Sequence, residues 1–314
     1  MEPGIAPQAN DHPSRAARLR GPAETVGVIG AGTMGHGIAQ VAATAGYKVL
    51  LRDVDLDALS RGIQAIERNL AKGRQLGKLT EADCDSTLQH IRGTTHLEEI
   101  ANADLVIEAA PERLELKQEI LRELEACSSK AFIFATNTSS LSITEIAKAS
   151  ERPALVVGMH FFNPVHLMRL VEIVVGKATG DDTVEVVREV ARRLRKDPIV
   201  VRDVPGFASS RLGVALGLEA MRMLEQGVAS ATDIDTAVEL GYNHPMGPLK
   251  LTDHVGLDIR LNIAEYLYKE LGSETFRPPE VLRRLVKEGK LGKKTGEGFY
   301  EWNQEKQSLA SSGL

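Results

Sequence analysis

Residues 25–53 have the sequence TVGVIGAGTMGHGIAQVAATAGYKVLLRD, and this stretch decides the fold of the chain. Its first residues, TVGVIG, form an apolar run typical of a short buried strand. A glycine-rich turn then leads into a helical pattern that Gly46 can end, and YKVLLRD is typical of a second strand. A strand, a glycine turn, a helix and a second strand within about 30 residues form a βαβ unit, which predicts a parallel sheet.

The turn GAGTMG matches the dinucleotide-binding pattern G-x-G-x-x-G in its full context, because it follows a strand and opens a helix. Asp53 ends the second strand, where its carboxylate can bind the ribose hydroxyls of adenosine and repel a 2′-phosphate. Arg52, next to it, is expected to point to the opposite face of the strand. We therefore expect NAD, rather than NADP, to be the cofactor. The predicted cofactor loop consists of Gly30, Ala31, Gly32, Thr33, Met34 and Gly35.

The rest of the chain divides at the DVPGF motif, residues 203–207. Before it, apolar runs typical of buried strands alternate with helical patterns, and a charged, helix-rich segment at 55–90 predicts a helical arm. After it, strand signals end and amphipathic helical patterns follow one another. The predicted strands span 104–110, 131–137, 154–160, 170–175 and 198–203; the later helices span 208–227, 231–241, 256–271 and 279–288.

This pattern predicts an α/β fold with three parts. Residues 1–22 are expected to be a disordered tail, because they contain several prolines and lack an apolar period. Residues 23–204 are expected to form a doubly wound, Rossmann-type NAD-binding domain with a mostly parallel sheet and a helical arm. Residues 205–314 are expected to form a smaller, all-α C-terminal domain for substrate binding and dimerisation.

Composition excludes several classes of function. The 314 residues carry a net charge of −5 and no basic cluster, so nucleic acid is not an expected partner. No apolar stretch approaches the roughly 18–20 residues that a membrane span needs. Cys84 and Cys127 lie far apart, without the spacing of a metal site, and two such thiols suit a reducing compartment. We therefore expect a cytoplasmic protein without a metal.

Two polar residues interrupt the apolar strands near the centre of the chain. His160 ends the strand at 154–160, and Glu172 lies within the strand at 170–175. If these strands are neighbours, Glu172 can hold one ring nitrogen of His160 and leave the other free to exchange a proton. Oxidation of an alcohol by NAD requires such a base. The alternative is a merely hydrogen-bonded, buried histidine, but the nearby dinucleotide fingerprint favours catalysis.

Other polar residues follow strands at the edge where ligands bind in such sheets. Ser139 in NTSSLSI can hold a substrate oxygen or cap a helix, and Asn163 in HFFNP can donate to a substrate carbonyl or simply form a turn. Glu112 and Lys117 can line the cofactor, or can be a capping acid and a solvated lysine.

Several motifs together closely resemble the L-3-hydroxyacyl-CoA dehydrogenases: VIGAGTMGHGIAQVAA, NTSSLSI, GMHFFNPV, LVEIV, DVPGF and HPMGPLKLTDHVGLD. The resemblance runs from about residue 24 to GKKTGEGFY near the end of the chain. It implies oxidation of an L-3-hydroxyacyl-CoA to the 3-ketoacyl-CoA, or the reverse, with NAD as the cofactor. The short chain is most similar to bacterial members, which implies 3-hydroxybutyryl-CoA as substrate.

The resemblance also implies residue roles. His160 corresponds to the family's base and Glu172 to its partner, while Ser139 and Asn163 correspond to contacts with substrate and nicotinamide. The arm is similar to the segment that holds CoA, with Lys72 or Arg74 near its phosphates. A homodimer through the C-terminal domain is also implied. The further NAD contacts implied are Glu112, Lys117 and Lys294.

The chain departs from the family pattern at one position of the site. Where the family usually has PGFxxNRL, this chain has PGFASSRL, with Ser210 in place of an asparagine. Two other functions therefore stay open. A dehydrogenase of a free 3-hydroxy acid would need a cation for the substrate, such as Arg169 or Arg211. A non-catalytic NAD-binding relative is favoured only by Ser210.

Overall fold

The structure, a computed structural model, describes residues 23–302. The predicted tail at residues 1–22 lies outside the described residues. Eight strands form one sheet in the order β3-β2-β1-β4-β5-β6-β7-β8, and every neighbouring pair is parallel except β6 and β7. The strands are β1 (Thr25–Ile29), β2 (Lys48–Arg52), β3 (Ile91–Thr94), β4 (Leu105–Glu108), β5 (Ile133–Thr136), β6 (Val156–Phe161), β7 (Leu170–Val175) and β8 (Asp197–Arg202). The mostly parallel sheet expected from the sequence is confirmed.

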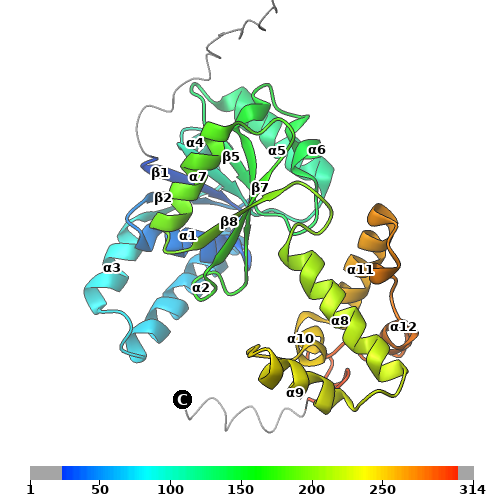
Figure 1. Ribbon diagram of the computed structural model, residues 1–314. Helices are drawn as coiled ribbons and strands as arrows, with labels where there is room; N and C mark the ends of the chain where they lie inside the picture. Colours follow the sequence, from blue (N-terminus) through cyan, green and yellow to red (C-terminus); the bar gives the residue numbers. More distant parts are fainter. Residues whose placement is uncertain (1–22, 303–314) are drawn as a thin grey trace, which may run out of the picture.

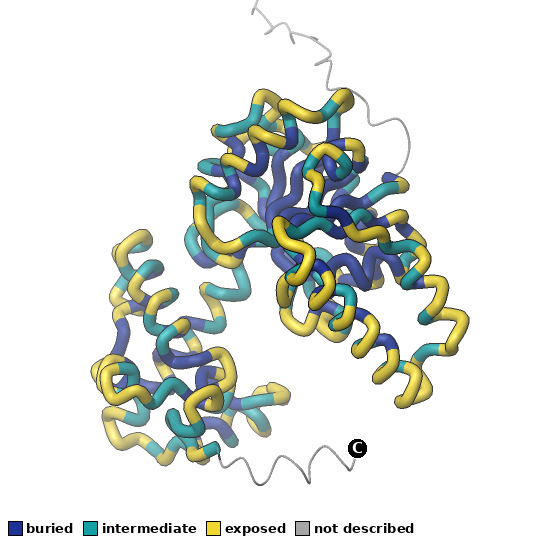
Figure 2. Tube along the Cα trace, turned by 180° about the vertical axis from the view of Figure 1, so that it is seen from behind, coloured by how far each residue is buried: buried dark blue, intermediate teal, exposed yellow. Residues whose placement is uncertain are grey.

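Helices cover both faces of this sheet, as Figure 1 shows. One face packs against α1 (Gly35–Thr44), α2 (Leu56–Gln75) and α7 (Asp181–Arg193). The other packs against α4 (Leu97–Ile100), α5 (Leu114–Cys127) and α6 (Ile143–Ala147). The strands are buried in the middle, in dark blue in Figure 2, because both of their faces are covered.

The predicted helical arm is confirmed as a hairpin of α2 and α3 (Glu81–Gln89), which projects from the sheet in Figure 1. Helix α3 begins at a capping box, in which the Thr80 hydroxyl accepts from the Asp83 N–H and the Asp83 carboxylate accepts in return. The hairpin is anchored through Ile66 and Leu70 of α2, which are buried against the sheet domain.

Helices alone form the C-terminal part, which has its own hydrophobic core. Leu218 and Met221 of α8 pack there with Leu249, Leu257 and Leu267. In residues 23–302 no helix is long and apolar enough to cross a membrane. The helices are α8 (Ser209–Glu225), α9 (Ala231–Gly241), α10 (Pro248–Val255), α11 (Leu257–Leu271) and α12 (Glu280–Lys287).

The antiparallel pairing of β6 with β7 places the two central polar residues together. In the register of this pair, His160 lies directly opposite Glu172. Side chains of directly opposed residues lie on the same face of a sheet, here the face covered by α5 and α6. His160 also lies near the carboxyl end of β6, beside the ends of β1, β4 and β5. The strands β6 and β7 are thus neighbours, as the prediction of a His160–Glu172 pair required.

Strand β3 and helix α10 are among the elements that were absent from the sequence prediction. Strand β3 is a four-residue edge strand whose middle residues are exposed, so it lacks an apolar run. Helix α10 begins at Pro248, in a segment whose Gly and Pro residues are typical of a turn. Proline fits the first helical position because that N–H has no partner within the helix.

Candidate active site

The glycine-rich loop between β1 and α1 has the geometry of a dinucleotide site. Gly30 has a φ of +92°, which a side chain would strain, and a Cβ at Gly35 would lie 1.6 Å from the Gly30 carbonyl oxygen. A Cβ at Gly32 would meet no atom within 4 Å, so this backbone is open to a ligand. Helix α1 starts without a side-chain cap, so its first N–H groups can bind a pyrophosphate.

Asp53 stands beside this loop at the end of β2. Its Oδ2 accepts the Ala31 N–H at 2.7 Å, which fixes the carboxylate against the loop where an adenosine ribose would bind. Arg52 points elsewhere and donates through Nε to the Thr95 carbonyl oxygen at 3.3 Å. These residues therefore fit NAD, and the arginine is not placed beside the carboxylate to receive a 2′-phosphate.

His160 and Glu172 form a hydrogen-bonded pair at the carboxyl edge of the sheet. Nδ1 of His160 lies 2.7 Å from Oε2 of Glu172, and both side chains are buried. The Phe162 ring lies 4.5 Å from the imidazole, centre to centre, and the Phe207 ring lies 6.0 Å away. The carboxylate fixes the Nδ1–H tautomer, so Nε2 is the nitrogen left to accept a proton.

The start of α8 supplies three more donors to Glu172. Its Oε1 accepts the N–H groups of Ala208 at 3.1 Å and Ser209 at 2.8 Å, while Oε2 accepts the Ser209 hydroxyl at 2.7 Å. Gly206 and Phe207 both have positive φ, 77° and 47°, which turns the following N–H groups towards the carboxylate. Consecutive N–H groups turned this way form an anion-binding nest.

These contacts determine the charge of Glu172. Burial alone would raise the pKa of this carboxyl, but hydrogen bonds from His160 and Ser209 outweigh it and hold the pKa below the usual value. Glu172 is therefore an anion at neutral pH, as a group that stabilises an imidazolium must be.

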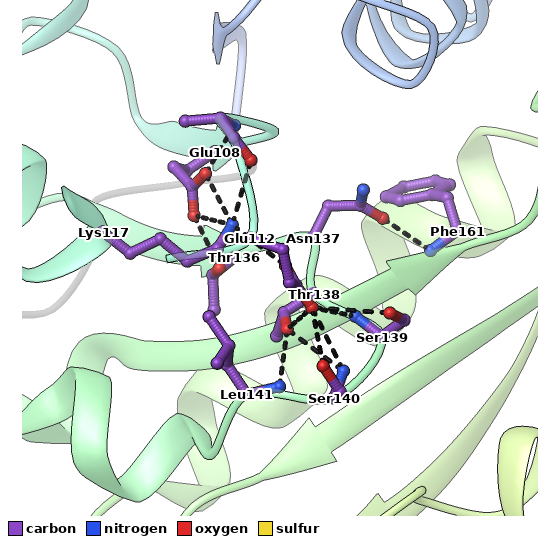
Figure 3. Close-up of polar contacts among 11 residues, drawn as sticks. Glu108, Glu112, Lys117, Thr136, Asn137, Thr138, Ser139, Ser140, Leu141 and Phe161 are labelled. Atoms are coloured by element: carbon purple, nitrogen blue, oxygen red, sulfur yellow. Dashed lines mark hydrogen bonds and ion pairs between the residues drawn. The ribbon is translucent and has the colours of Figure 1, made fainter. Parts of the chain in front are cut away.

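The loop after β5 is held by a second carboxylate. Oε1 of Glu112 accepts the Ser139 N–H at 3.0 Å, the Ser139 hydroxyl at 3.4 Å and the Thr138 hydroxyl at 2.5 Å, as Figure 3 shows. Asn137 ties the same loop to β6, because its Oδ1 accepts the Phe161 N–H at 2.9 Å. Ser139 is exposed at the edge next to His160, where a ligand can reach its hydroxyl.

Lys117 is not solvated but fully buried. Its Nζ donates to both oxygens of Glu108, at 2.8 and 2.9 Å, and lies 3.7 Å from Oε2 of Glu112. The Thr136 hydroxyl also donates to Glu108, at 2.6 Å, so this network supports the ends of β4 and β5 (Figure 3). A contact of Lys117 with NAD stays a prediction. In this arrangement its ammonium forms an ion pair with Glu112, which itself holds the loop after β5.

Three other predicted residues are not drawn into these networks. Asn163 is exposed and, among residues 23–302, has no side-chain hydrogen bond. Ser210 lies in the first turn of α8, next to Ser209, and does not bond to Glu172. Lys294, in the helical domain, is paired with Asp258, at 2.6 and 2.7 Å from its two carboxylate oxygens.

A basic cavity of about 650 Å³ lies between α1, the arm, the end of α7 and the loop after β6. Lys72 lines it, whereas Arg74 does not and is paired with Glu81 at 3.4 Å. No acidic residue lines it, so the cavity favours a polyanion. The basic lining residues are Lys72, Lys78, His166, Arg169, Arg193, Arg195 and Lys196.

Sequence reasoning missed several residues of the site. Asn137, Thr138 and Glu108 follow or end strands at the correct edge, and that position is a signal that could have found them. Ser209 gives no such signal, because its partner Glu172 is 37 residues away along the chain. In the described part of the chain, no cluster of three His, Cys, Asp or Glu side chains could hold a metal ion.

Comparison with known proteins agrees with this geometry. The family of the 3-hydroxyacyl-CoA dehydrogenase NAD binding domain matches residues 25–204, and that of the 3-hydroxyacyl-CoA dehydrogenase C-terminal domain matches residues 206–302. A probable 3-hydroxybutyryl-CoA dehydrogenase of Deinococcus radiodurans is 46% identical over 88% of this chain and 99% of its own. The 3-hydroxybutyryl-CoA dehydrogenase of Clostridioides difficile is 41% identical over 88% of this chain and 99% of its own.

A solved structure is similar over the same extent. The (S)-3-hydroxybutyryl-CoA dehydrogenase of Ralstonia eutropha superposes with a TM-score of 0.87 at 41% identity, over 90% of this chain and all of the other. The first family match covers the nucleotide loop and the His160–Glu172 pair, and the second covers the helical domain. The chain therefore belongs to the 3-hydroxyacyl-CoA dehydrogenase family and is an NAD-dependent oxidoreductase.

Proposed function

We propose that the protein interconverts L-3-hydroxybutyryl-CoA and acetoacetyl-CoA, with His160 as the acid–base group and Glu172 as its partner. The observation that carries this proposal is the position of the pair, buried at the carboxyl edge of a sheet beside a dinucleotide loop. The short-chain substrate is supported by the names of the relatives at 41–46% identity.

The proton passes through Nε2 of His160. During oxidation this nitrogen would take the proton of the substrate hydroxyl. NAD, held by the loop of residues 30–35 and by Asp53, would supply the hydride acceptor for the same carbinol carbon. The imidazolium that forms is stabilised by the anionic Glu172 at Nδ1. In the reverse direction the imidazolium returns the proton to the substrate oxygen. Such acid–base catalysis contributes roughly 10²–10⁴ in rate.

Donors at the same edge are proposed to hold the substrate oxygen. The Ser139 hydroxyl is exposed there, on a loop that Glu112 and Asn137 fix from two sides. The exposed Asn163 amide, on the loop after β6, is free to donate to the thioester carbonyl. Donors fixed in advance stabilise developing negative charge at little cost of reorganisation. Ser210, in the first turn of α8, is proposed as the remaining polar contact.

The basic cavity is proposed to bind the phosphates of CoA. Lys72 offers an exposed ammonium there, and the lining residues His166 and Arg169 follow His160 on the loop after β6. A free 3-hydroxy acid would need a cation beside His160 to bind its carboxylate. Arg169 is paired with Asp197 at 2.8 Å, and the Arg211 guanidinium lies over the Phe276 ring at 5.8 Å. Arg169 therefore already has a carboxylate partner, which supports the thioester over a free acid as the substrate.

Lys294 and the cofactor loop complete the proposed NAD site. The Lys294 segment wraps around Asp253, which accepts the N–H groups of Phe299 and Tyr300 at 2.9 Å each. This fixes the segment to the helical domain, so movement of that domain towards the sheet would bring Lys294 to the cofactor. Binding of NAD by Glu112, Lys117 and Lys294 is part of the proposal.

We also propose a cytoplasmic homodimer that pairs through the helical domain. Both cysteines, Cys84 and Cys127, are free thiols, which suits a reducing compartment. Helices α8 and α9 expose Leu212, Leu240 and Tyr242, with 71%, 81% and 78% of each residue accessible. An interface between two helical domains would remove these apolar side chains from water, which supports the proposed dimer.

The test is oxidation of NADH with acetoacetyl-CoA, with free acetoacetate, and by His160→Gln with the thioester. We expect fast turnover of the thioester only, reduced about 10²-fold or more by the substitution. His244→Gln, in an exposed loop, is the matched control and should retain activity. If the wild type binds NADH but turns over no acyl-CoA, the non-catalytic alternative is supported, and Ser210→Asn shows whether the serine is the cause.

A further inference from the structure

Ser209 and His160 share one oxygen of Glu172. The Ser209 hydroxyl donates to Oε2 at 2.7 Å, and the imidazole Nδ1 lies 2.7 Å from the same atom. The other oxygen, Oε1, is held by the N–H groups of Ala208 and Ser209. The backbone alone therefore fixes the position of the carboxylate, and the hydroxyl is an additional donor at the atom that binds the imidazole.

A donor at a shared oxygen changes the strength of the other bond. The hydroxyl draws negative charge on Oε2 towards itself, which leaves less for the imidazolium. It also stabilises the ionised carboxylate when the imidazole is neutral, which favours the neutral form of His160. Both effects make His160 a weaker base than it would be beside Glu172 without the hydroxyl.

We propose that Ser209 is a positioning residue that sets the basicity of His160 by hydrogen bonding to Glu172. The inference goes beyond the proposed function, although its kinetic test rests on that function. It also assigns a role to one of the two serines of PGFASSRL that the sequence pattern left without one.

In the described part of the chain, the main groups that lower the pKa of Glu172, against the opposing effect of burial, are His160 and Ser209. The carboxylate contacts His160 of β6 and the hydroxyl and N–H groups at the start of α8 already named. On the other side, the strand register places the uncharged Ile199 of β8 opposite Glu172. The rings beside His160 are those of Phe162 and Phe207, which carry no charge. The electrostatics of the pair therefore depend on these hydrogen bonds.

The test compares Ser209→Ala with Ser209→Thr, which keeps the hydroxyl. For oxidation, kcat/KM requires neutral His160, so its acidic limb should move to higher pH by about half to one unit in Ser209→Ala. At pH values on the acidic limb, kcat/KM of Ser209→Ala should be about three- to tenfold below that of the wild type. On the alkaline plateau, the two kcat/KM values should differ by less than about twofold. Ser209→Thr should restore the wild-type limb.

A matched control exists in the same domain. The Ser230 hydroxyl donates to Asp233 at 2.7 Å, the same distance as Ser209 to Glu172, but at the cap of α9. Ser230→Ala removes an equivalent hydrogen bond and should not move the limb. A merely structural role of Ser209 predicts something else, a lower rate at every pH with unshifted limbs, and this result would overturn the proposal.

A second measurement separates this inference from the proposed function. NMR titration of the histidine ring, with the His160 signal assigned through His160→Gln, reports the imidazole directly and needs no turnover. In Ser209→Ala, the midpoint of this signal should move to higher pH by the same half to one unit. If the wild type turns over acyl-CoA but the titration midpoint is unchanged in Ser209→Ala, the inference fails while the proposed function stands.

Discussion

Glu172 lies directly opposite His160 across the only antiparallel strand pair of the described sheet, and its Oε2 lies 2.7 Å from Nδ1 of the ring. An antiparallel pair places opposed side chains on the same face, close enough for a direct hydrogen bond. The parallel pair of β4 and β5 brings Glu108 and Thr136 together in a similar way, so the register between β6 and β7 creates the acid–base pair.

Replacing Glu172 by Gln should lower kcat by about 10²–10⁴-fold. The amide has nearly the same shape but no charge, so the imidazolium loses its stabilising partner. Steady-state kinetics with acetoacetyl-CoA and NADH measure this, and KM for NADH serves as the control because Glu172 does not touch the nucleotide loop. A loss below about threefold would show that the carboxylate charge is not needed.

The same substitution should change how stability depends on pH. Since hydrogen bonds hold the folded-state pKa of Glu172 below its usual value, ionisation of this group stabilises the fold above the unfolded-state pKa of about 4.3. That contribution is lost as pH falls through the lower folded-state pKa. Urea unfolding from pH 7 to pH 3 should show a stability difference between wild type and Glu172→Gln that shrinks with acid. A constant difference would contradict this.

Replacing Asp53 by Ala should raise KM for NAD by about tenfold, because a carboxylate hydrogen bond to ribose contributes about 1.5–3 kcal/mol. The kcat at saturating NAD should stay within about twofold. Activity with NADP should improve relative to NAD, since the repulsion of the 2′-phosphate is removed. KM measurements for both cofactors check this, and an unchanged ratio would show that Asp53 does not select the cofactor.

Replacing Lys72 by Ala should raise KM for acetoacetyl-CoA about three- to tenfold with little change in kcat, because it removes a cation from the basic cavity. Arg74→Ala is the matched control, since Arg74 is paired with Glu81 outside the cavity. A pantetheine thioester, which lacks the nucleotide phosphates, should not distinguish Lys72→Ala from wild type. If Lys72→Ala raised KM equally for acetoacetyl-CoA and for the pantetheine thioester, the proposal that the cavity binds the CoA phosphates would be wrong.

Replacing Arg260 by Met should raise the free energy of unfolding by about 1–3 kcal/mol. This guanidinium is buried against Gly213 and Gly217, its Nε has no hydrogen-bond partner among residues 23–302, and burial lowers its pKa to about 10. A flexible apolar side chain avoids the cost of burying an unpaired charge. Urea midpoints measure the effect, and a clear loss of stability would reveal a partner for this arginine.

Replacing the exposed Leu240 by Asp should weaken the proposed homodimer, because a carboxylate is costly in an apolar interface. Light scattering at micromolar concentration should give twice the chain mass for wild type and a lower mass for Leu240→Asp. Val54→Asp, on an exposed turn of the nucleotide domain, is the control and should not change the mass. A monomeric wild type would contradict the dimer.

Much of the fold could be predicted from the sequence because buried parallel strands and amphipathic helices leave distinct patterns. The reversal of β7 was also within reach, since residues 162–169 are too few for the crossover that parallel neighbours require. Strand β3 lacks such a pattern because it forms an exposed edge and is defined by its pairing with β2.

The candidate site was predictable in its chemistry but not in its supporting contacts. His160, Glu172 and Asp53 stand out because polar residues interrupt or end apolar strands. Ser209 could not be found in this way, because a serine near a helix start is most often a cap. The burial of Lys117 was not predictable for a related reason: a lysine in an amphipathic helix is usually solvated, and its partner Glu108 is what makes burial possible.

The donors that hold Glu172 come from residues 208 and 209, just beyond the junction between the two parts of the chain. A fragment cut at residue 204 would retain the cofactor loop and the His160–Glu172 pair, yet its buried carboxylate would lose three of its four donors. Likewise, a chimaera with the helical domain of a relative would keep these donors only if the new domain supplied equivalent residues at positions 208 and 209. The two parts are therefore not independent modules, because the acid–base pair has all its hydrogen bonds only when both parts come from compatible sequences.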